Sequence, residues 1–227
     1  MISTFIVATL AINDKEVKAR ANVEPILKQY SKAAGIEYPP KQVFFRAFKD
    51  ERTLEIWGAN SATSKLRLLQ KYRVLAASGT LGPKRRYGDM QVPEGWCFID
   101  RFNPFSSYHL SLGLNYPNGA DRALATSSDP GGDIFIHGNQ VSAGCLAMGN
   151  SSIEEIYTIA RMANGKVRVL ILPSRKKPLD RNNSRLYSQI YSINQSFASN
   201  HRMPLVSIDA NGNYKVKEPI SLAGRGR

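Results

Sequence analysis

The alternation of hydrophobic and polar positions predicts several short β-strands. The segments KQVFFRAF (41–48) and RTLEIW (52–57) are rich in aromatic and β-branched residues and are separated by the charged KDE. This pattern is typical of a β-hairpin. A longer strand pattern follows in LRLLQKYRVLAASG (66–79). Further strands are expected in GWCFI (95–99), YHLSLGL (108–114), GGDIFIHG (131–138), KVRVLIL (166–172) and GNYKVKE (212–218).

Three other segments have the spacing of amphipathic helices. In NVEPILKQYSKAAG (22–35), Pro25 marks a helix start and Gly35 a C-terminal stop. In SIEEIYTIARMANG (152–165), Ser152 is the expected N-cap and Gly165 lies near the end. RLYSQIYSINQSFASN (185–200) is the third helix. The inward faces of the first two are expected to carry Ile26, Leu27, Tyr30, Ala33 and Ala34, and Ile153, Ile156, Ile159 and Ala160.

This mixture of elements, without an internal repeat or a low-complexity linker, predicts a single α+β domain with a mainly β core. We divide the chain into three parts. Residues 1–38 form an N-terminal segment with a docking helix, and residues 39–175 form the catalytic domain. Residues 176–227 form a helical C-terminal extension packed on the same domain and end in the loose tail SLAGRGR.

Composition and charge restrict the class of protein. A chain of 227 residues with 42% hydrophobic and 22% charged residues is a globular protein rather than a disordered or collagen-like one. The net charge of +13 favours an anionic partner, such as a nucleic acid, an anionic lipid or an acidic cell-wall polymer. The basic residues form few runs, and no zinc-finger, KH or RNP pattern is present, so nucleic acid is not the expected partner.

The first residues, MISTFIVATLAIND (1–14), contain an apolar run that is too short for a membrane span. They also lack the basic n-region of a complete signal peptide. Three interpretations stay open: export information trimmed from the chain, a remnant of an h-region, or a buried strand.

The stretch HGNQVSAGC (137–145) contains one of three histidines and one of two cysteines among small and polar residues. Cys97, in an aromatic-rich strand signal, is expected to be a buried, inert thiol, whereas Cys145 follows Gly144 in a loop, where a reactive thiol is expected. An imidazole near neutral pH can take the thiol proton, so His137 is the candidate base.

Neighbouring groups can complete such a site. A backbone carbonyl at or beside Gly138 can hold the imidazole tautomer in place of a carboxylate. The N–H groups of Gly144 and Cys145 can form an oxyanion hole, and Ser142 can brace the loop or donate to the substrate. For an arbitrary pair of residues, a small core cysteine and a satisfied strand histidine would be the commoner interpretation.

The pattern HG-x-x-x-S-x-G-C resembles the catalytic signature of the L,D-transpeptidase (YkuD-type) family of bacterial peptidoglycan enzymes. GTLGPKRRYGDMQVPEGWCFID (79–100) and NPFSSYHLSLGLNYPNGADRA (103–123) resemble further family segments. The closest branch contains the murein L,D-endopeptidase or amidase that releases lipoprotein from peptidoglycan, whose C-terminal segment is similar to MPLVSIDANGNYKV (203–216). The resemblance covers residues 43–216.

This resemblance implies a β-rich, sandwich-like catalytic domain with Cys145 as nucleophile and His137 as base. The implied reaction is attack on a diaminopimelate carbonyl of a stem peptide to give a thioester. An amine acceptor then yields a cross-link or a protein anchor, and water yields hydrolysis. Peptidoglycan stem peptides, and a wall-anchored lipoprotein, are the implied partners, the bacterial periplasm or cell envelope is the implied location, and no metal or organic cofactor is implied.

The chain departs from the family pattern at two positions. Many transpeptidases have S-H-G-C with an arginine soon after the cysteine, whereas this chain has Ala143 and CLAM. The lipoprotein-releasing branch also lacks that second histidine, so the departure bears on acceptor choice more than on catalysis. That branch often has a cysteine where this chain has Gln140.

Three further residues are candidates for substrate binding. Arg122 suits a substrate with free carboxylates, although an ion pair with Asp121 is an equal alternative. Tyr108 is expected in the core or the cleft wall, and Asn139 lies inside the signature. The remaining histidines are expected on a strand face (His109) and in solvent (His201), and three dispersed histidines make a zinc site improbable.

Two other functions stay open. One is a basic wall-binding module that has lost turnover, and the other is a secreted antibacterial effector that uses the same domain against rival cell walls.

Overall fold

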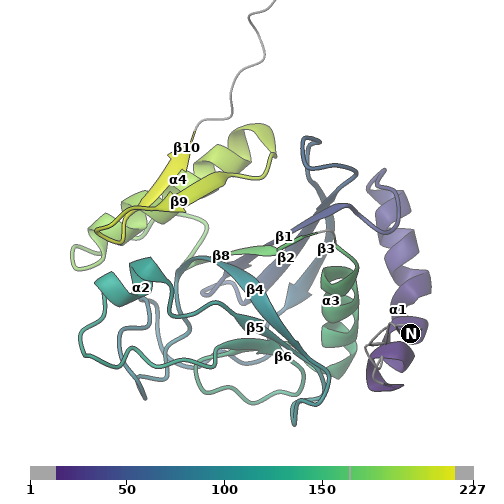
Figure 1. The fold of residues 1–227 in the computed structure, drawn as a ribbon, viewed down its shortest axis with the longest axis horizontal. Helices are drawn as coiled ribbons and strands as arrows, with labels where there is room; N and C mark the ends of the chain where they lie inside the picture. The colour runs from purple at the N-terminus through teal and green to yellow at the C-terminus, as the bar shows by residue number, and fades with distance from the viewer. Residues whose placement is uncertain (1–13, 164, 218–227) are drawn as a thin grey trace, which may run out of the picture.

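An eight-stranded mixed sheet forms the centre of the protein, with helices packed on both of its faces (Figure 1). The computed structural model describes residues 14–163 and 165–217. The elements in chain order are α1 (Asp14–Ala33), β1 (Gln42–Phe48), β2 (Thr53–Ala59), β3 (Arg67–Arg73), β4 (Gly95–Asn103), β5 (Ser111–Leu114), α2 (Gly119–Ala123), β6 (Phe135–His137), β7 (Leu146–Ala147), α3 (Asn150–Met162), β8 (Arg168–Leu172), α4 (Ser184–Asn200), β9 (Leu205–Ile208) and β10 (Tyr214–Lys217).

The sheet has the strand order β3-β2-β1-β8-β4-β5-β6-β7. The pairs β1·β8 and β6·β7 are parallel, and the others are antiparallel. β4 connects two halves, because its first residues pair with β8 and its later residues pair with β5 across an irregularity between Ile99 and Arg101. The predicted α+β class is confirmed, and the half formed by β5, β6 and β7 carries the stretch 137–145 at its edge.

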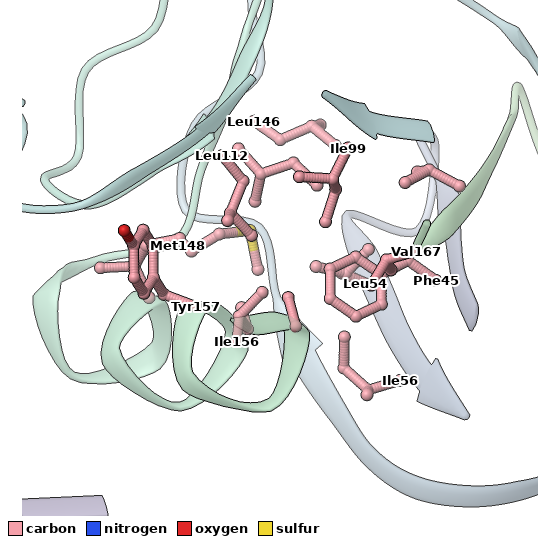
Figure 2. Packing of buried hydrophobic residues seen from close by; sticks show 14 of the residues in the cluster. Phe45, Leu54, Ile56, Ile99, Leu112, Leu146, Met148, Ile156, Tyr157 and Val167 are labelled. Carbon is pink, nitrogen blue, oxygen red and sulfur yellow. The ribbon is translucent and has the colours of Figure 1, made fainter. Parts of the chain in front are cut away.

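β1 shows why the sheet needs helices on both sides. Side chains alternate across a strand, so its two faces bury different sets of residues. Val43, Phe45 and Ala47 join a cluster with residues of α1 and α3, whereas Phe44 and Phe48 join a second cluster with α4. Figure 2 shows the first cluster, where side chains of the sheet meet Ile156 and Tyr157 of α3. A strand buried on both faces reads as a nearly continuous apolar run, as QVFFRAF does.

The first helix differs from the prediction at its start. α1 begins at Asp14, so Pro25 lies inside the helix rather than near its first turn. The added segment is polar and has little apolar periodicity, but it is rich in strong helix formers, and Glu24 pairs with Arg20 and Lys28 at i,i+4 spacing. Ala33 is exposed, contrary to the prediction, and the buried positions are Ala19, Val23, Leu27 and Ser31.

The predicted stop at Gly35 is confirmed. Gly35 has a φ of 66°, and the N–H of Ile36 donates to the Ser31 carbonyl at 2.8 Å while that of Gly35 donates to Lys32. These two bonds form a Schellman motif, which requires a residue with positive φ and satisfies carbonyls at the helix end.

The prediction that α3 starts at Ser152 is wrong. The helix begins at Asn150, and its N-cap Gly149 contributes no side-chain hydrogen bond. Asn150 Oδ1 instead accepts the N–H of Asn139 at 2.9 Å. The start of α3 is therefore tied to the loop that follows His137, a long-range contact that local capping rules do not reveal.

The C-terminal segment packs against the sheet. The predicted helix is confirmed as α4, whose Ile190, Ile193 and Phe197 are fully buried together with Phe44 and Trp96 of the sheet. β9 pairs with β10 in a separate two-stranded sheet. The short elements β7, β9 and α2 were not expected from the sequence.

Two expectations fall outside the described residues: those for the apolar N-terminal run through residue 13 and for the C-terminal tail from residue 218. The three-part division of the chain stays a prediction. Among the described helices, none combines the length and the hydrophobicity that crossing a membrane requires.

A buried ionic network links β1, β2 and the segment after β8. Arg46 and Glu55 are 8% and 1% exposed, and Arg46 donates through Nε and Nη2 to Glu55 Oε2 at 3.0 and 2.7 Å. Arg175 Nη2 donates to Oε1 of the same carboxylate at 2.7 Å. Burial alone would raise the pKa of Glu55, but the hydrogen bonds from Arg175, Arg46 and Trp57 outweigh it and hold the pKa below its usual value.

Replacing Glu55 with alanine is expected to destabilise the protein by about 3–5 kcal/mol, because the buried Arg46 guanidinium would lose its carboxylate. The measurement is the free energy of unfolding in denaturant. Since the pKa of Glu55 is lowered on folding, its contribution is present above the unfolded pKa of about 4.3 and is lost as pH falls through the folded value. Glu51→Ala is the control, since its pair with Arg175 is solvent-exposed and contributes at most about 1 kcal/mol.

Candidate active site

The register of β6 and β7 brings His137 and Cys145 to one face of the sheet. Ile136 pairs with Leu146 and His137 pairs with Ala147 in parallel register, and Cys145 directly precedes β7. Ile136 and Leu146 are buried in the core, so alternation turns Phe135, His137 and Cys145 to the opposite face. Residues eight positions apart in sequence thus become neighbours across two strands.

A groove of about 560 Å³ lies over this face. It contains both His137 and Cys145, together with Ser142 and Tyr108 from the predicted set. Its remaining lining residues are Asn103, Phe105, Ser106, Ser107, Ser111, Asp133, Phe135, Val141 and Ala143. The groove is mixed in character, with exposed aromatic side chains, hydroxyl groups and one carboxylate.

His137 is held in a single orientation. The residue is 3% exposed, and Nδ1 lies 2.6 Å from the Gly138 carbonyl oxygen. A carbonyl can only accept, so Nδ1 carries the proton and Nε2 has the free lone pair in the neutral ring. The Tyr108 ring packs beside it, with centroids 4.8 Å apart. Burial lowers the pKa of His137 and outweighs the Gly138 carbonyl, which acts in the opposite direction. The lowered pKa keeps the imidazole neutral at pH 7.

Gly138 is required at its position by a close backbone approach. A Cβ there would lie 2.5 Å from the Tyr108 carbonyl oxygen. A side chain would therefore push apart the two segments that hold the imidazole. The predicted carbonyl next to the histidine is present with the expected geometry.

Cys145 lies in the wall of the groove with a neutral thiol. Its Sγ accepts the N–H of Phe135 at 3.4 Å and lies 3.8 Å from the Asp133 carbonyl oxygen. Burial raises the pKa of the thiol and Asp133 raises it further, whereas the Phe135 N–H and Lys84 act in the opposite direction. Within the described residues the thiol makes no hydrogen bond to His137, so the expected direct contact is not formed in this structure.

Alkylation of Cys145 by iodoacetamide is therefore expected to be slow at pH 7 and to rise with an apparent pKa above the free-cysteine value of about 8.5. The physical reason is that the thiolate is the nucleophile and that burial disfavours it. Mass spectrometry of the labelled peptide at a series of pH values measures this. A fast, pH-independent reaction down to pH 5 would instead indicate a permanent thiolate–imidazolium pair.

Two serines hold the cysteine loop. Ser142 Oγ donates to the Cys145 carbonyl at 2.6 Å and accepts the Cys145 N–H at 3.0 Å. The N–H of Gly144, whose φ is +96°, donates to Ser78 Oγ at 2.5 Å. The bracing role considered for Ser142 has the required geometry. The N–H groups of Gly144 and Cys145 both donate to serine oxygens here, so the predicted oxyanion hole is not preformed and stays a prediction.

Two predicted substrate-binding residues do not line this groove. Arg122 is exposed on α2, and its neighbour Asp121 is engaged in the capping box of that helix, where it accepts the Asn118 N–H at 2.9 Å. Asn139 supports the loop, since its carbonyl accepts the Gly149 N–H and its Oδ1 accepts the Gln140 N–H.

The other histidines and cysteine are structural. The prediction that His109 lies on a strand face is wrong: it precedes β5 in a turn with a φ of 72°, and its Nε2 lies 2.7 Å from Glu154 Oε1. His201 is exposed, as expected, and stacks on Trp57. Cys97 is buried in β4, and burial raises its pKa strongly, as expected of an inert thiol.

Sequence reasoning missed several groove residues and one support. Ser111 faces the site because it pairs with His137 across β5 and β6. Asp133 lies four positions before His137 in the sequence. Of the missed groove residues, it is the one with a local signal, because an acidic side chain directly after Gly131 and Gly132 is a candidate for a functional loop. Ser78 is 66 positions away from Gly144, so only the fold brings them together.

The arrangement suits nucleophilic chemistry rather than metal binding. A neutral imidazole with a fixed tautomer and a thiol share one groove, as a nucleophile and its base require. Among residues 14–163 and 165–217, no group of three or more His, Cys, Asp and Glu side chains is placed to hold a metal ion.

Comparison with known proteins identifies the family. The YkuD family, described as the L,D-transpeptidase catalytic domain, matches residues 45–171, more than half of the chain. The chain belongs to this family. The family match runs from within β1 to within β8, and hence includes both His137 and Cys145.

Two relatives support the same family. The chain is 32% identical over 213 residues to a protein named "Putative L,D-transpeptidase YafK" from Escherichia coli (strain K12), with 88% of this chain and 82% of the relative covered. The protein of the same name from Escherichia coli O157:H7 matches equally well.

A solved structure shares the fold. The helical cell shape determining protein Pgp2 from Campylobacter jejuni is similar with a TM-score of 0.50 and 19% identity over 76% of this chain. The match spans 63% of the Pgp2 chain, less than two thirds of its length. At this identity the similarity describes the L,D-transpeptidase-like fold.

Proposed function

We propose that this protein is a cell-envelope cysteine enzyme that acts on peptidoglycan stem peptides through an acyl-enzyme on Cys145. The observation that carries the proposal is the placement of Cys145 and a tautomer-fixed His137 in one groove of an L,D-transpeptidase-family domain. The relatives' name suggests the reaction class. The proposed location outside the cytoplasmic membrane follows from the substrate.

In the proposed mechanism, His137 Nε2 takes the thiol proton as Sγ attacks the carbonyl of a diaminopimelyl residue. Catalytic hydrogen bonds often tighten only when substrate is bound, so rotation of the Cys145 side chain away from the Asp133 carbonyl is the first step. The C–S bond forms, and the tetrahedral intermediate collapses when the leaving amine takes the proton from the imidazolium. Water or an amine then attacks the thioester, with His137 again as base.

Stabilisation of the oxyanion needs donors that the serines release. Because Ser142 lines the groove and its hydroxyl both donates and accepts, turning its O–H from the Cys145 carbonyl to the substrate supplies one donor. The same movement of the Ser142 hydroxyl takes its oxygen away from the Cys145 N–H, which can then act as a second donor to the oxyanion. The role of Gly144 in the oxyanion hole and the roles of Arg122, Asn139 and Tyr108 in substrate binding stay predictions.

Muropeptide analysis tests the function. Purified protein incubated with sacculi is expected to change the muropeptide profile, whereas Cys145→Ala protein leaves it unchanged. Released lipoprotein-derived peptides or free stem ends would assign hydrolysis, as in the lipoprotein-releasing branch, and dimers linked between diaminopimelyl residues would assign cross-linking. Retained sacculus binding with an unchanged profile for both proteins would contradict the enzyme and favour a wall-binding module.

A further inference from the structure

The charge inside the groove is opposite in sign to that of the whole chain. The chain has a net charge of +13, yet the groove is lined by neither lysine nor arginine. Its one carboxylate is Asp133, and its imidazole, on His137, is neutral at pH 7. A groove of this kind favours a cationic group on the ligand over an anionic one.

The backbone of Asp133 lies beside the reacting sulfur, and its side chain lines the same groove. Its backbone oxygen lies 3.8 Å from Cys145 Sγ, and its carboxylate is 83% exposed. Its φ of 52° is an uncommon left-handed conformation for a residue with a side chain, and such conformations occur preferentially at functional sites. The backbone conformation therefore holds the Cα of Asp133, from which the carboxylate extends, near Cys145.

The carboxylate is only weakly engaged within the protein. Arg101 Nη1 lies 3.5 Å from Asp133 Oδ1, at the limit of a hydrogen bond, and the Arg101 side chain is 47% exposed. Arg101 also contacts Asp100 through Nε at 3.3 Å. An exposed pair of this kind contributes little, so it can be exchanged for a ligand cation at small cost.

We propose that the Asp133 carboxylate binds the free side-chain ammonium of the diaminopimelyl residue whose carbonyl is attacked by Cys145. This inference rests on the proposed function and names the residue that selects the acyl donor. The ammonium group and the attacked carbonyl belong to the same residue of the substrate, just as Asp133 and Cys145 Sγ are neighbours in the groove. Asp133 would thus orient the donor before attack.

The same carboxylate affects the free thiol in the opposite sense. Its negative charge adds to the burial that raises the pKa of Cys145. A bound ammonium neutralises this charge, so donor binding would both position the carbonyl and favour the thiolate. Removing the carboxylate is then expected to make the thiol more reactive toward a neutral alkylating reagent and less reactive toward the proper donor.

The test uses two synthetic stem tetrapeptides that are identical except that the side-chain amine of the diaminopimelyl residue is free in one and acetylated in the other. The rate of acylation of Cys145 is followed by intact-protein mass spectrometry over a range of donor concentrations. The wild-type protein is expected to prefer the free-amine donor by about tenfold, the effect of one hydrogen-bonded charge contact. In Asp133→Asn this preference falls to near one, while iodoacetamide alkylates Cys145 no more slowly than in wild type.

Asparagine is the suitable replacement because it also tolerates left-handed backbone and keeps the shape of the side chain. Asp100→Asn is the matched control: it removes the same charge and also contacts Arg101, but does not line the groove. This variant is expected to keep the wild-type preference between the two donors.

Each other outcome overturns the inference. An unchanged preference in Asp133→Asn, or equal slowing of both donors and of alkylation, means that Asp133 does not bind the donor ammonium. A defect confined to the attack of an added amine on a preformed thioester would place Asp133 with the acceptor instead. If neither donor acylates folded wild-type protein, the proposed function itself is wrong, and the role of Asp133 falls with it.

Discussion

Cys145→Ala protein is expected to form no covalent adduct with stem peptides or with a carbapenem and to lose turnover by at least about 10³-fold. The reason is that Cys145 carries the one thiol among the described residues that line the groove, and His137, the candidate base, lines the same groove. Intact-protein mass spectrometry with and without ligand measures the adduct, and peptide mapping locates it.

Cys97→Ala is the matched control for this experiment. Cys97 is buried in β4, and burial raises its pKa strongly, so its thiol has neither access nor thiolate character. The Cys97 variant is expected to keep the adduct with the wild-type mass shift. An adduct that persists in folded Cys145→Ala protein, or that maps to another residue in wild type, would contradict the assignment of the nucleophile.

His137→Ala is expected to slow acylation of Cys145 by about 10²–10⁴-fold, the usual range for loss of a general base. In wild type, the acylation rate should fall as pH drops through the lowered pKa of His137, since only the neutral ring accepts a proton. Without the imidazole, the rate should instead increase with pH toward the raised pKa of the Cys145 thiol. A pH profile of acylation from pH 4 to 10 distinguishes the two proteins.

His109→Ala is the control for the base. His109 directly follows Tyr108, which lines the groove. The His109 side chain is hydrogen-bonded to Glu154 and does not line the groove. Its replacement is expected to leave the pH profile of acylation unchanged. If the His137 and His109 variants share one profile with wild type, proton transfer from Cys145 does not involve an imidazole.

The Cys145 and His137 variants distinguish a nucleophile and base that act together from two residues that are only neighbours in the groove. In the structure the thiol contacts the Phe135 N–H and the Asp133 carbonyl rather than His137, so Cys145 and His137 do not form a preformed ion pair. A strong effect of His137 on acylation together with slow alkylation of the free thiol would show that the base acts after the donor has bound. That combination also explains how a cysteine enzyme limits oxidation and unwanted alkylation of its nucleophile.

The sequence predicted the elements that depend on local periodicity. β1, β2, β4, β6, β8 and α4 are where alternation or helical spacing indicated, because each buries a regular set of apolar side chains. The end of α1 before Gly35 was also predicted from the sequence, because the positive φ of the residue after the helix favours glycine. The starts of α1 and α3 were not, because the first turns of α1 have little apolar periodicity and the first residue of α3, Asn150, makes a contact with Asn139 that local capping rules do not reveal.

For the site, the sequence by itself indicated the candidate groups: a loop cysteine, a strand-end histidine and a carbonyl at Gly138 within hydrogen-bonding distance of the imidazole. Tertiary structure alone decided which groups surround them. Ser78 reaches Gly144 from a distant loop, Ser111 faces His137 through strand register, and Arg122 lies outside the groove. The physical reason is that backbone periodicity is a local property, whereas the lining of a groove depends on the packing of segments far apart in the chain.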